Sequence, residues 1–144
     1  MGMNLQKTIK ESIEFEGVGL HSGIKANLLL KPAESNSGIK FKRTDVDNAK
    51  NIIEASYKNV SSSILCTKIK NSYGVSVSTI EHLMAAFYLE GTDNVLVEID
   101  APEVPIMDGS AFDFVEAMRL VGTQEQNYSK KFIKVLKKVE VRDG

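Results

Sequence analysis

The feature that most constrains the fold is a change of hydrophobic period near residue 79. Before this point apolar residues alternate with polar ones, as Ile9, Ile13 and Phe15 do, and such alternation is typical of half-buried strands. Over residues 80–88 the apolar residues instead follow the i, i+3, i+4, i+7 spacing of an amphipathic helix. The chain therefore combines strands and helices in separate segments.

Two helices are predicted, each bounded by residues that suit helix ends. A serine or threonine at 78–79 can cap the first helix, and Gly91 can end it. The second begins near Ser110, because Ser110 and Asp113 have the spacing of a capping box, and Gly122 closes it. Its buried stripe comprises Ala111, Phe114, Val115, Met118 and Val121.

Turn residues divide the remaining apolar segments into strands. The predicted strands are a hairpin of Lys25–Lys31 and Gly38–Arg43 around Pro32–Ser37, a second hairpin of Ile64–Lys70 and Val75–Ser78, and a strand over Asn94–Ile99. Strands followed by helix, strand and helix predict an α+β fold. We expect a two-layer sandwich, in which two helices pack on one face of a mostly antiparallel or mixed sheet.

The end of the chain has a different pattern. Thr123–Ser129 is polar and indicates a linker, whereas Lys131–Val141 alternates like another strand. We therefore expect a first domain over 1–126, followed over 127–144 by a linker and the first strand of a truncated second domain.

Composition excludes several classes of protein. The 144 residues carry 18 basic and 19 acidic side chains, and a net charge of -1 does not favour nucleic acid as a partner. The single cysteine, Cys66, cannot form an intramolecular disulfide. No apolar run approaches the roughly 20 residues that a transmembrane segment needs. The expected location is the cytoplasm.

Glu81 and His82 are the residues most suited to chemistry. Histidine is a common zinc ligand, and a neighbouring carboxylate can act as general base toward a metal-bound water. Adjacent residues on a helix point about 100° apart, so a metal would have to lie beside the first turn. Taken alone, the dipeptide more often represents a solvated acid beside a hydrogen-bonded histidine.

Other candidates have simple structural explanations. His21, the second histidine, lies between glycines and is typical of an exposed loop. Cys66 falls within a predicted strand, where a buried free cysteine usually acts as a small hydrophobic residue. Asp108–Ser110 is explained by a turn and a helix cap.

Four segments together resemble one family. These are Gly17–Gly23 (GVGLHSG), Thr79–Ala86 (TIEHLMAA), Asp93-Asn94 and Ala101–Ser110 (APEVPIMDGS). In this order they are similar to the amino-terminal domain of the UDP-3-O-acyl-N-acetylglucosamine deacetylases of lipid A synthesis. The resemblance covers nearly the whole chain.

The resemblance implies roles for individual residues. His82 matches a zinc ligand, and Glu81 matches the general base that activates the zinc-bound water. His21 matches a histidine near the metal, and together with Leu20 it is expected to line the substrate cleft. A segment lining the substrate cleft is matched by Ile64, Leu65, Cys66 and Thr67. The substrate would be a UDP-linked acylated amino sugar.

The resemblance also implies a second domain, which supplies the other two of three zinc ligands, a histidine and an aspartate. We therefore expect this chain, as an amino-terminal fragment, to be inactive alone. Two alternatives remain open: a non-catalytic folding or partner-binding module, and a zinc hydrolase of this fold with another amide substrate.

Overall fold

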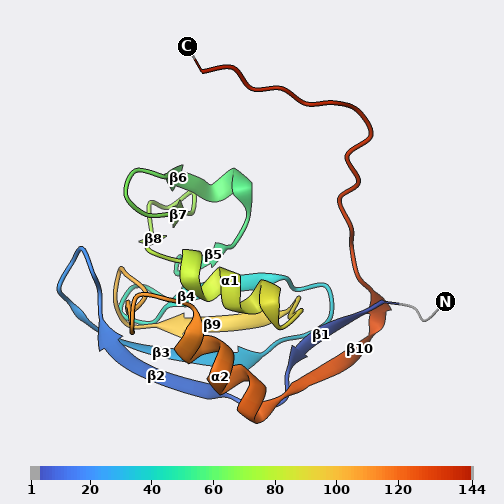
Figure 1. Cartoon of the computed structure of the whole chain (residues 1–144). Coiled ribbons are helices and arrows are strands. Elements are labelled where there is room, and N and C mark those ends of the chain that lie inside the picture. The colour runs from blue at the N-terminus through green and yellow to red at the C-terminus, as the bar shows by residue number, and fades with distance from the viewer. Residues whose placement is uncertain (1–3, 144) are drawn as a thin grey trace.

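The computed structural model describes residues 4–143 and has the predicted α+β sandwich architecture. Its main layer is a five-stranded sheet of order β2-β3-β9-β4-β5, and both helices cover one face of it (Figure 1). The strands are β2 (Ile13–Val18), β3 (Lys25–Pro32), β9 (Val95–Ile99), β4 (Ile39–Arg43) and β5 (Ile52–Glu54). The prediction of a mixed sheet with two helices on one face is confirmed.

The first predicted hairpin is wrong, because β9 lies between its two strands. β3 pairs with β9 in antiparallel fashion, and β4 pairs with the other edge of β9 in parallel. The connection over 33–38 therefore crosses the end of β9, a strand that comes later in the chain, and does not form a hairpin loop. Central placement suits β9, since Val95, Val97 and Ile99 are all buried on the helix side.

The core lies between the sheet and the two helices. α1 (Glu81–Leu89) buries Leu83, Ala86 and Phe87, and α2 (Phe112–Val121) buries Phe114, Val115 and Met118. On α2 these are the positions predicted for its stripe. The rings of Phe114 and Phe15 meet edge to face, with centroids 4.9 Å apart, and so pack α2 onto β2.

The predicted helix ends are confirmed, but the predicted caps are not. Gly122 follows α2 with φ 78°, and Gly91 follows α1 with φ 63°. Neither helix has a side-chain hydrogen bond at its N-cap, which is Ile80 in α1 and Ala111 in α2. The hydroxyl of Ser110 instead accepts from the amide of Phe112, one residue too early for a capping box.

Two smaller sheets flank the main one. β6 (Val60–Ser62), β7 (Lys68–Lys70) and β8 (Ser76–Val77) follow the short 3₁₀ helix Tyr57–Asn59 and form an antiparallel sheet. β7 and β8 confirm the second predicted hairpin, with shorter strands. Arg43 at the end of β4 donates to the carbonyl of Ser76 at 2.7 Å and so joins this sheet to the main one.

The segment predicted as a linker is a strand. β10 (Thr123–Ser129) pairs antiparallel with β1 (Leu5–Ile9), and the two form a ribbon at one end of the molecule (Figure 1). The alternating residues Ile9, Ile13 and Phe15 likewise belong to two strands, because a bend at 10–12 separates β1 from β2. Polar composition misled the prediction, since β10 is held by its backbone ladder and buries little apolar surface.

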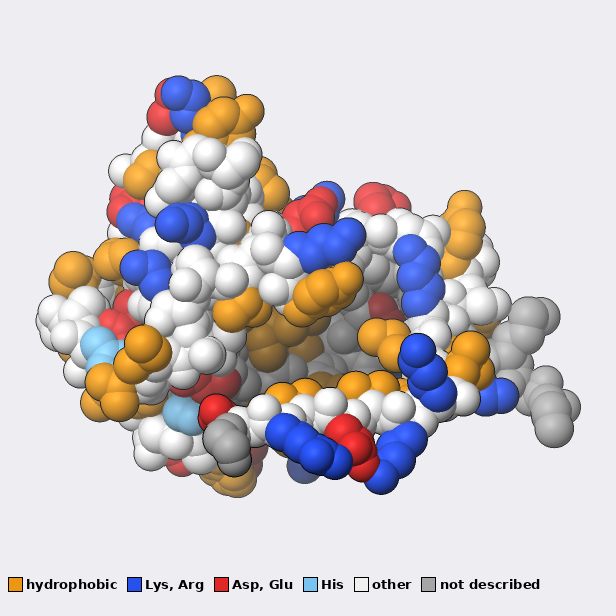
Figure 2. Space-filling view, turned by 90° about the horizontal axis from the view of Figure 1, so that it is seen from above, with side chains coloured by type: hydrophobic (Ala, Val, Ile, Leu, Met, Phe, Trp, Pro, Cys, Tyr) orange, Lys and Arg blue, Asp and Glu red, His pale blue; other side chains and the backbone are white. Residues whose placement is uncertain are grey.

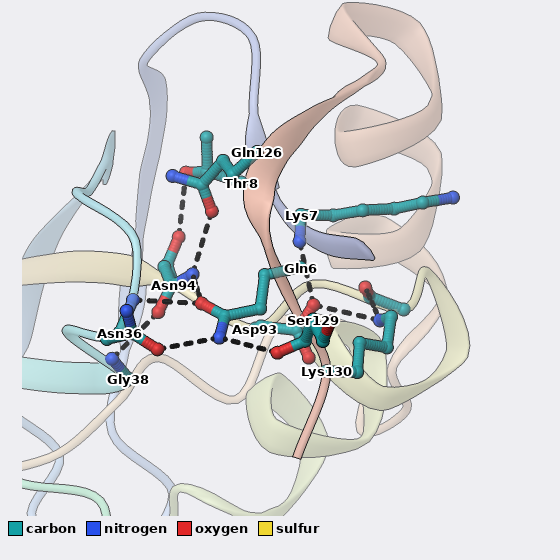
Figure 3. Close-up of polar contacts among 11 residues, drawn as sticks. Gln6, Lys7, Thr8, Asn36, Gly38, Asp93, Asn94, Gln126, Ser129 and Lys130 are labelled. Atoms are coloured by element: carbon teal, nitrogen blue, oxygen red, sulfur yellow. Dashed lines mark hydrogen bonds and ion pairs between the residues drawn. The ribbon is translucent and has the colours of Figure 1, made fainter. Parts of the chain in front are cut away.

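A network of amides attaches this ribbon to the main sheet (Figure 3). The Asn94 amide donates to the side-chain oxygens of Gln6 and Gln126, at 2.9 and 2.7 Å. Asp93 accepts from the backbone N–H of Lys7 at 2.7 Å and forms an ion pair with Lys130 at 2.8 Å. Asp93-Asn94, one of the four resembling segments, therefore has a structural role.

Residues 130–143 form no helix or strand, contrary to the strand predicted over Lys131–Val141. A strand needs a hydrogen-bonded neighbour, and this segment runs away from the sheets (Figure 1). The predicted boundary between residues 126 and 127 falls inside β10; the division into domains stays a prediction. Neither described helix has the length and apolar character needed to cross a membrane.

Candidate active site

Glu81 and His82 lie on the first turn of α1, and both side chains are partly buried. They are neither enclosed in the core nor fully solvated. The Glu81 carboxylate accepts a hydrogen bond from the backbone N–H of Thr67, with 2.9 Å between Oε2 and N. This contact attaches the segment before β7 to the start of α1. It brings together two of the residues that the resemblance singled out.

A groove of about 460 Å³ runs beside Glu81. Its lining residues come from α1 and from the segments on either side of the small sheet: Ala55, Ser56, Tyr57, Val60, Thr67, Ile69, Ile80, Glu81, Met84 and Ala85. Most of these side chains are apolar, with a carboxylate at one side. A groove of this kind can bind the apolar part of a ligand and place a polar group against Glu81.

The rest of the predicted cleft-lining segment is more open. Ile64 and Leu65 are 80% and 85% exposed, and Leu65 has a positive φ of 64°. Cys66 lies in a bend and is partly buried, so the prediction of a buried cysteine within a strand is wrong. That Ile64, Leu65 and Cys66 line a substrate cleft stays a prediction.

Asp108, predicted from the sequence only as a turn residue, lies within electrostatic range of His82. Asp108 accepts two hydrogen bonds from Ser110, both at 2.8 Å, and these lower the pKa of its carboxyl; nearby His82 adds a smaller electrostatic contribution in the same direction. The only sequence signal for this neighbour was that Asp108 and His82 both fall within the resembling segments.

His21 lies in the exposed loop between β2 and β3, next to Leu20, which is 62% exposed. The structure connects this loop to α1 through a buried acid, Glu103. The backbone N–H groups of His21 and Ser22 donate to the Glu103 carboxylate, and so does the hydroxyl of Thr79. Both histidines of the chain show at one end of the molecule, each with acidic side chains beside it (Figure 2). Glu103 was not among the residues predicted for the site, although it falls within the resembling segment Ala101–Ser110.

Residues 4–143 do not by themselves form a complete metal site. Within this part of the chain, no group of three histidine, cysteine, aspartate or glutamate side chains converges on one point. A catalytic zinc site usually has three protein ligands. His82 can therefore offer one donor, and the remaining donors would have to come from elsewhere.

Comparison with known proteins identifies the family of the chain. Residues 6–144 match the family model described as UDP-3-O-acyl N-acetylglycosamine deacetylase. The chain is 51% identical over 142 residues to the UDP-3-O-acyl-N-acetylglucosamine deacetylase of Shewanella pealeana, covering 99% of this chain and 46% of that protein. It is 49% identical over 139 residues to the enzyme of the same name from Pasteurella multocida, covering 96% of this chain and 45% of that protein. The chain thus spans a little under half the length of these relatives, and it belongs to the UDP-3-O-acyl N-acetylglycosamine deacetylase family.

Proposed function

We propose that the protein containing this chain hydrolyses the acetamide of UDP-3-O-acyl-N-acetylglucosamine, a step of lipid A biosynthesis, and that this chain contributes half of the active site. The observation that carries the proposal is the position of Glu81 and His82. They are adjacent, partly exposed and placed on the first turn of one helix, and Glu81 lines a groove. Relatives that are about half identical carry the name of this activity.

In this proposal His82 provides one of three protein ligands to a zinc ion. When bound, zinc would polarise the acetamide carbonyl and make water a stronger nucleophile near neutral pH. A partly exposed imidazole suits this role, because it must be neutral and accessible to bind the ion. The other ligands would come from the second half of the protein.

Glu81 acts as general base. It accepts a proton from water while the water oxygen bonds to the acetamide carbon. The C–N bond then breaks, the nitrogen takes up a proton, and acetate and the free amine are released. The hydrogen bond from Thr67 holds one carboxylate oxygen, so the other can turn toward the substrate. Fixing the carboxylate in this way reduces the reorganisation needed during the reaction.

The outer surfaces of the helices fit a partner half. Tyr88, Leu89, Phe112 and Leu120 are between 56% and 87% exposed, although they lie on or next to α1 and α2. Apolar surface of this kind is usually covered by another domain. We propose that the second half of the protein packs there.

A cytoplasmic location fits the absence of a possible intramolecular disulfide in this chain.

The direct test compares the full-length protein with the 144-residue chain. We expect the full-length protein to bind zinc stoichiometrically and to release acetate from the nucleotide sugar. We expect no measurable turnover and only weak zinc binding from the chain alone, because it has a single proposed ligand. Metal analysis and an acetate assay on both forms give the answer.

Each outcome of this comparison has a distinct meaning. A full-length protein that cleaves a different amide but not the nucleotide sugar would contradict the proposed substrate. A full-length protein with neither zinc nor hydrolase activity would support a binding module instead. Tight stoichiometric zinc on the chain alone would contradict the division of ligands between two halves.

A further inference from the structure

Glu103 is a buried acid that lies between the His21 loop and the turn before α1. Glu103 is 2% exposed, and its carboxylate accepts hydrogen bonds from two other segments. Oε1 accepts from the His21 N–H at 3.0 Å and from the Thr79 hydroxyl at 2.8 Å, while Oε2 accepts from the Ser22 N–H at 2.7 Å. Because burying a carboxylate is costly, such full satisfaction indicates a specific role.

The His21 loop is shaped to close over this carboxylate. A Cβ atom on Gly19 would lie 2.4 Å from Glu103 Oε2, and one on Gly17 would lie 2.8 Å from the Cβ of Pro105. Real Cβ atoms do not approach so closely, so only glycine permits the contact. The backbone of Ile106 also donates to the carbonyl of Val18 at 3.0 Å. The two glycines thus fit the loop to the segment that carries Glu103.

On its other side Glu103 holds the turn that leads into α1. Thr79 is buried and has a positive φ of 56°, a strained conformation for a β-branched residue that persists only where the surroundings hold it. The Glu103 carboxylate and a short parallel bridge between Ser78 and Glu103 supply those contacts. Glu81 follows two residues after Thr79, so this turn sets the direction in which α1 begins.

We propose that Glu103 is a positioning residue, whose carboxylate fixes the His21 loop to the turn that precedes α1. The side chains of His21, Glu81 and His82 are thereby held in a fixed arrangement. Glu103 does not itself touch substrate or metal in this inference. The inference rests on the proposed function, since it gives a purpose to the arrangement of Glu81 and His82. For stability alone, a well-packed apolar residue would serve as well as a buried charge.

The decisive variant is Glu103→Gln in the full-length protein. All three partners of Glu103 donate, so an amide in the same place must set its NH₂ group against at least one backbone N–H. We expect kcat to fall on the order of 10- to 100-fold, because a displacement of about 1 Å at a catalytic group has effects of this size. KM should stay within about threefold, since Glu103 makes no substrate contact.

A second readout separates positioning from simple loss of activity. In Glu103→Gln, amide hydrogen exchange measured by mass spectrometry should become at least about tenfold faster in peptides covering 19–23 and 78–82. Exchange in α2 should stay unchanged. The matched control is Glu98→Gln. Glu98 accepts from Lys31 and Lys42, at 2.7 and 3.2 Å, on the main sheet, and its loss should change neither kcat nor exchange at the site.

Thr79 provides a test that does not depend on the folding of the Glu103 variant. Thr79→Val keeps the shape but loses the hydroxyl that donates to Glu103, and it should lower kcat. Thr79→Ser keeps the hydroxyl and should restore most of the activity. Equal kcat in the valine and serine variants would contradict the inference.

The outcome also distinguishes the inference from the proposed function. If Glu81→Gln abolishes turnover while Glu103→Gln keeps kcat within about twofold, the positioning role is wrong and the proposed function stands. If both variants keep normal turnover, the proposed function itself is wrong.

Discussion

Replacing Glu81 by Gln in the full-length protein should lower kcat for deacetylation by about 10²- to 10⁴-fold, the usual contribution of a general base. The amide has nearly the shape of the carboxylate but cannot take a proton from water. Its oxygen can still accept from the N–H of Thr67, which lies 2.9 Å from Glu81 Oε2. We therefore expect an unchanged fold, and the loss can be assigned to chemistry.

Zinc content and a control variant make this prediction specific. Because Glu81 is proposed as a base and not as a ligand, the variant should keep its zinc, whereas His82→Ala should lose it. Glu90→Gln is the matched control. Glu90 directly follows the same helix and pairs with Arg119 at 2.9 Å, away from the groove, so turnover should stay normal. Normal turnover in the Glu81 variant would contradict the assigned role.

The parts of the fold that could be predicted depend on local periodicity. Apolar segments bounded by turn residues identified β3 and β9, and the 3.6-residue period identified both helices together with the buried Phe114 and Met118. These patterns arise because each element buries one side against the same core. The confirmed sandwich follows from the order of the elements along the chain.

The errors concern contacts between distant segments. Local pattern could not show that β9 separates β3 from β4, because strand order depends on all the strands at once. Nor could it show that the polar segment β10 pairs with β1 through a ladder of backbone hydrogen bonds. Ser78 or Thr79 was expected to cap α1, but the Thr79 hydroxyl donates to Glu103 instead.

The candidate site was predicted in the same uneven way. Glu81 and His82 could be singled out because their residue types suit metal chemistry. Glu103 could not, since a lone glutamate between two prolines carries no such signal. Its role depends on His21, some 80 residues earlier in the chain, and only the folded structure brings the two together.

The acid stability of the protein should depend on Glu103. Burial by itself raises the pKa of this carboxyl, and it is the largest single effect. The hydrogen bonds from Ser22, His21 and Thr79 together outweigh it, however, and lower the pKa from 4.5 to about 2. A folded-state pKa below the unfolded value means that the unfolded chain binds a proton more readily. The resulting stabilisation is complete above pH 4.5 and is lost as the pH falls toward 2.

This depression of the pKa corresponds to roughly 3 kcal/mol of unfolding free energy, since each pH unit is worth about 1.4 kcal/mol. The free energy of unfolding, measured with urea at pH 6 and pH 2, should fall in both the wild type and Glu103→Gln. The wild type should lose this amount in addition. The variant has no proton to bind at this position, so its disadvantage relative to the wild type should shrink at pH 2. Glu34→Gln, at an exposed position in the loop after β3, should follow the wild type throughout. Identical pH dependence in the wild type and Glu103→Gln would show that Glu103 is not held as a carboxylate, and the contact that joins the His21 loop to α1 would then lose its physical basis.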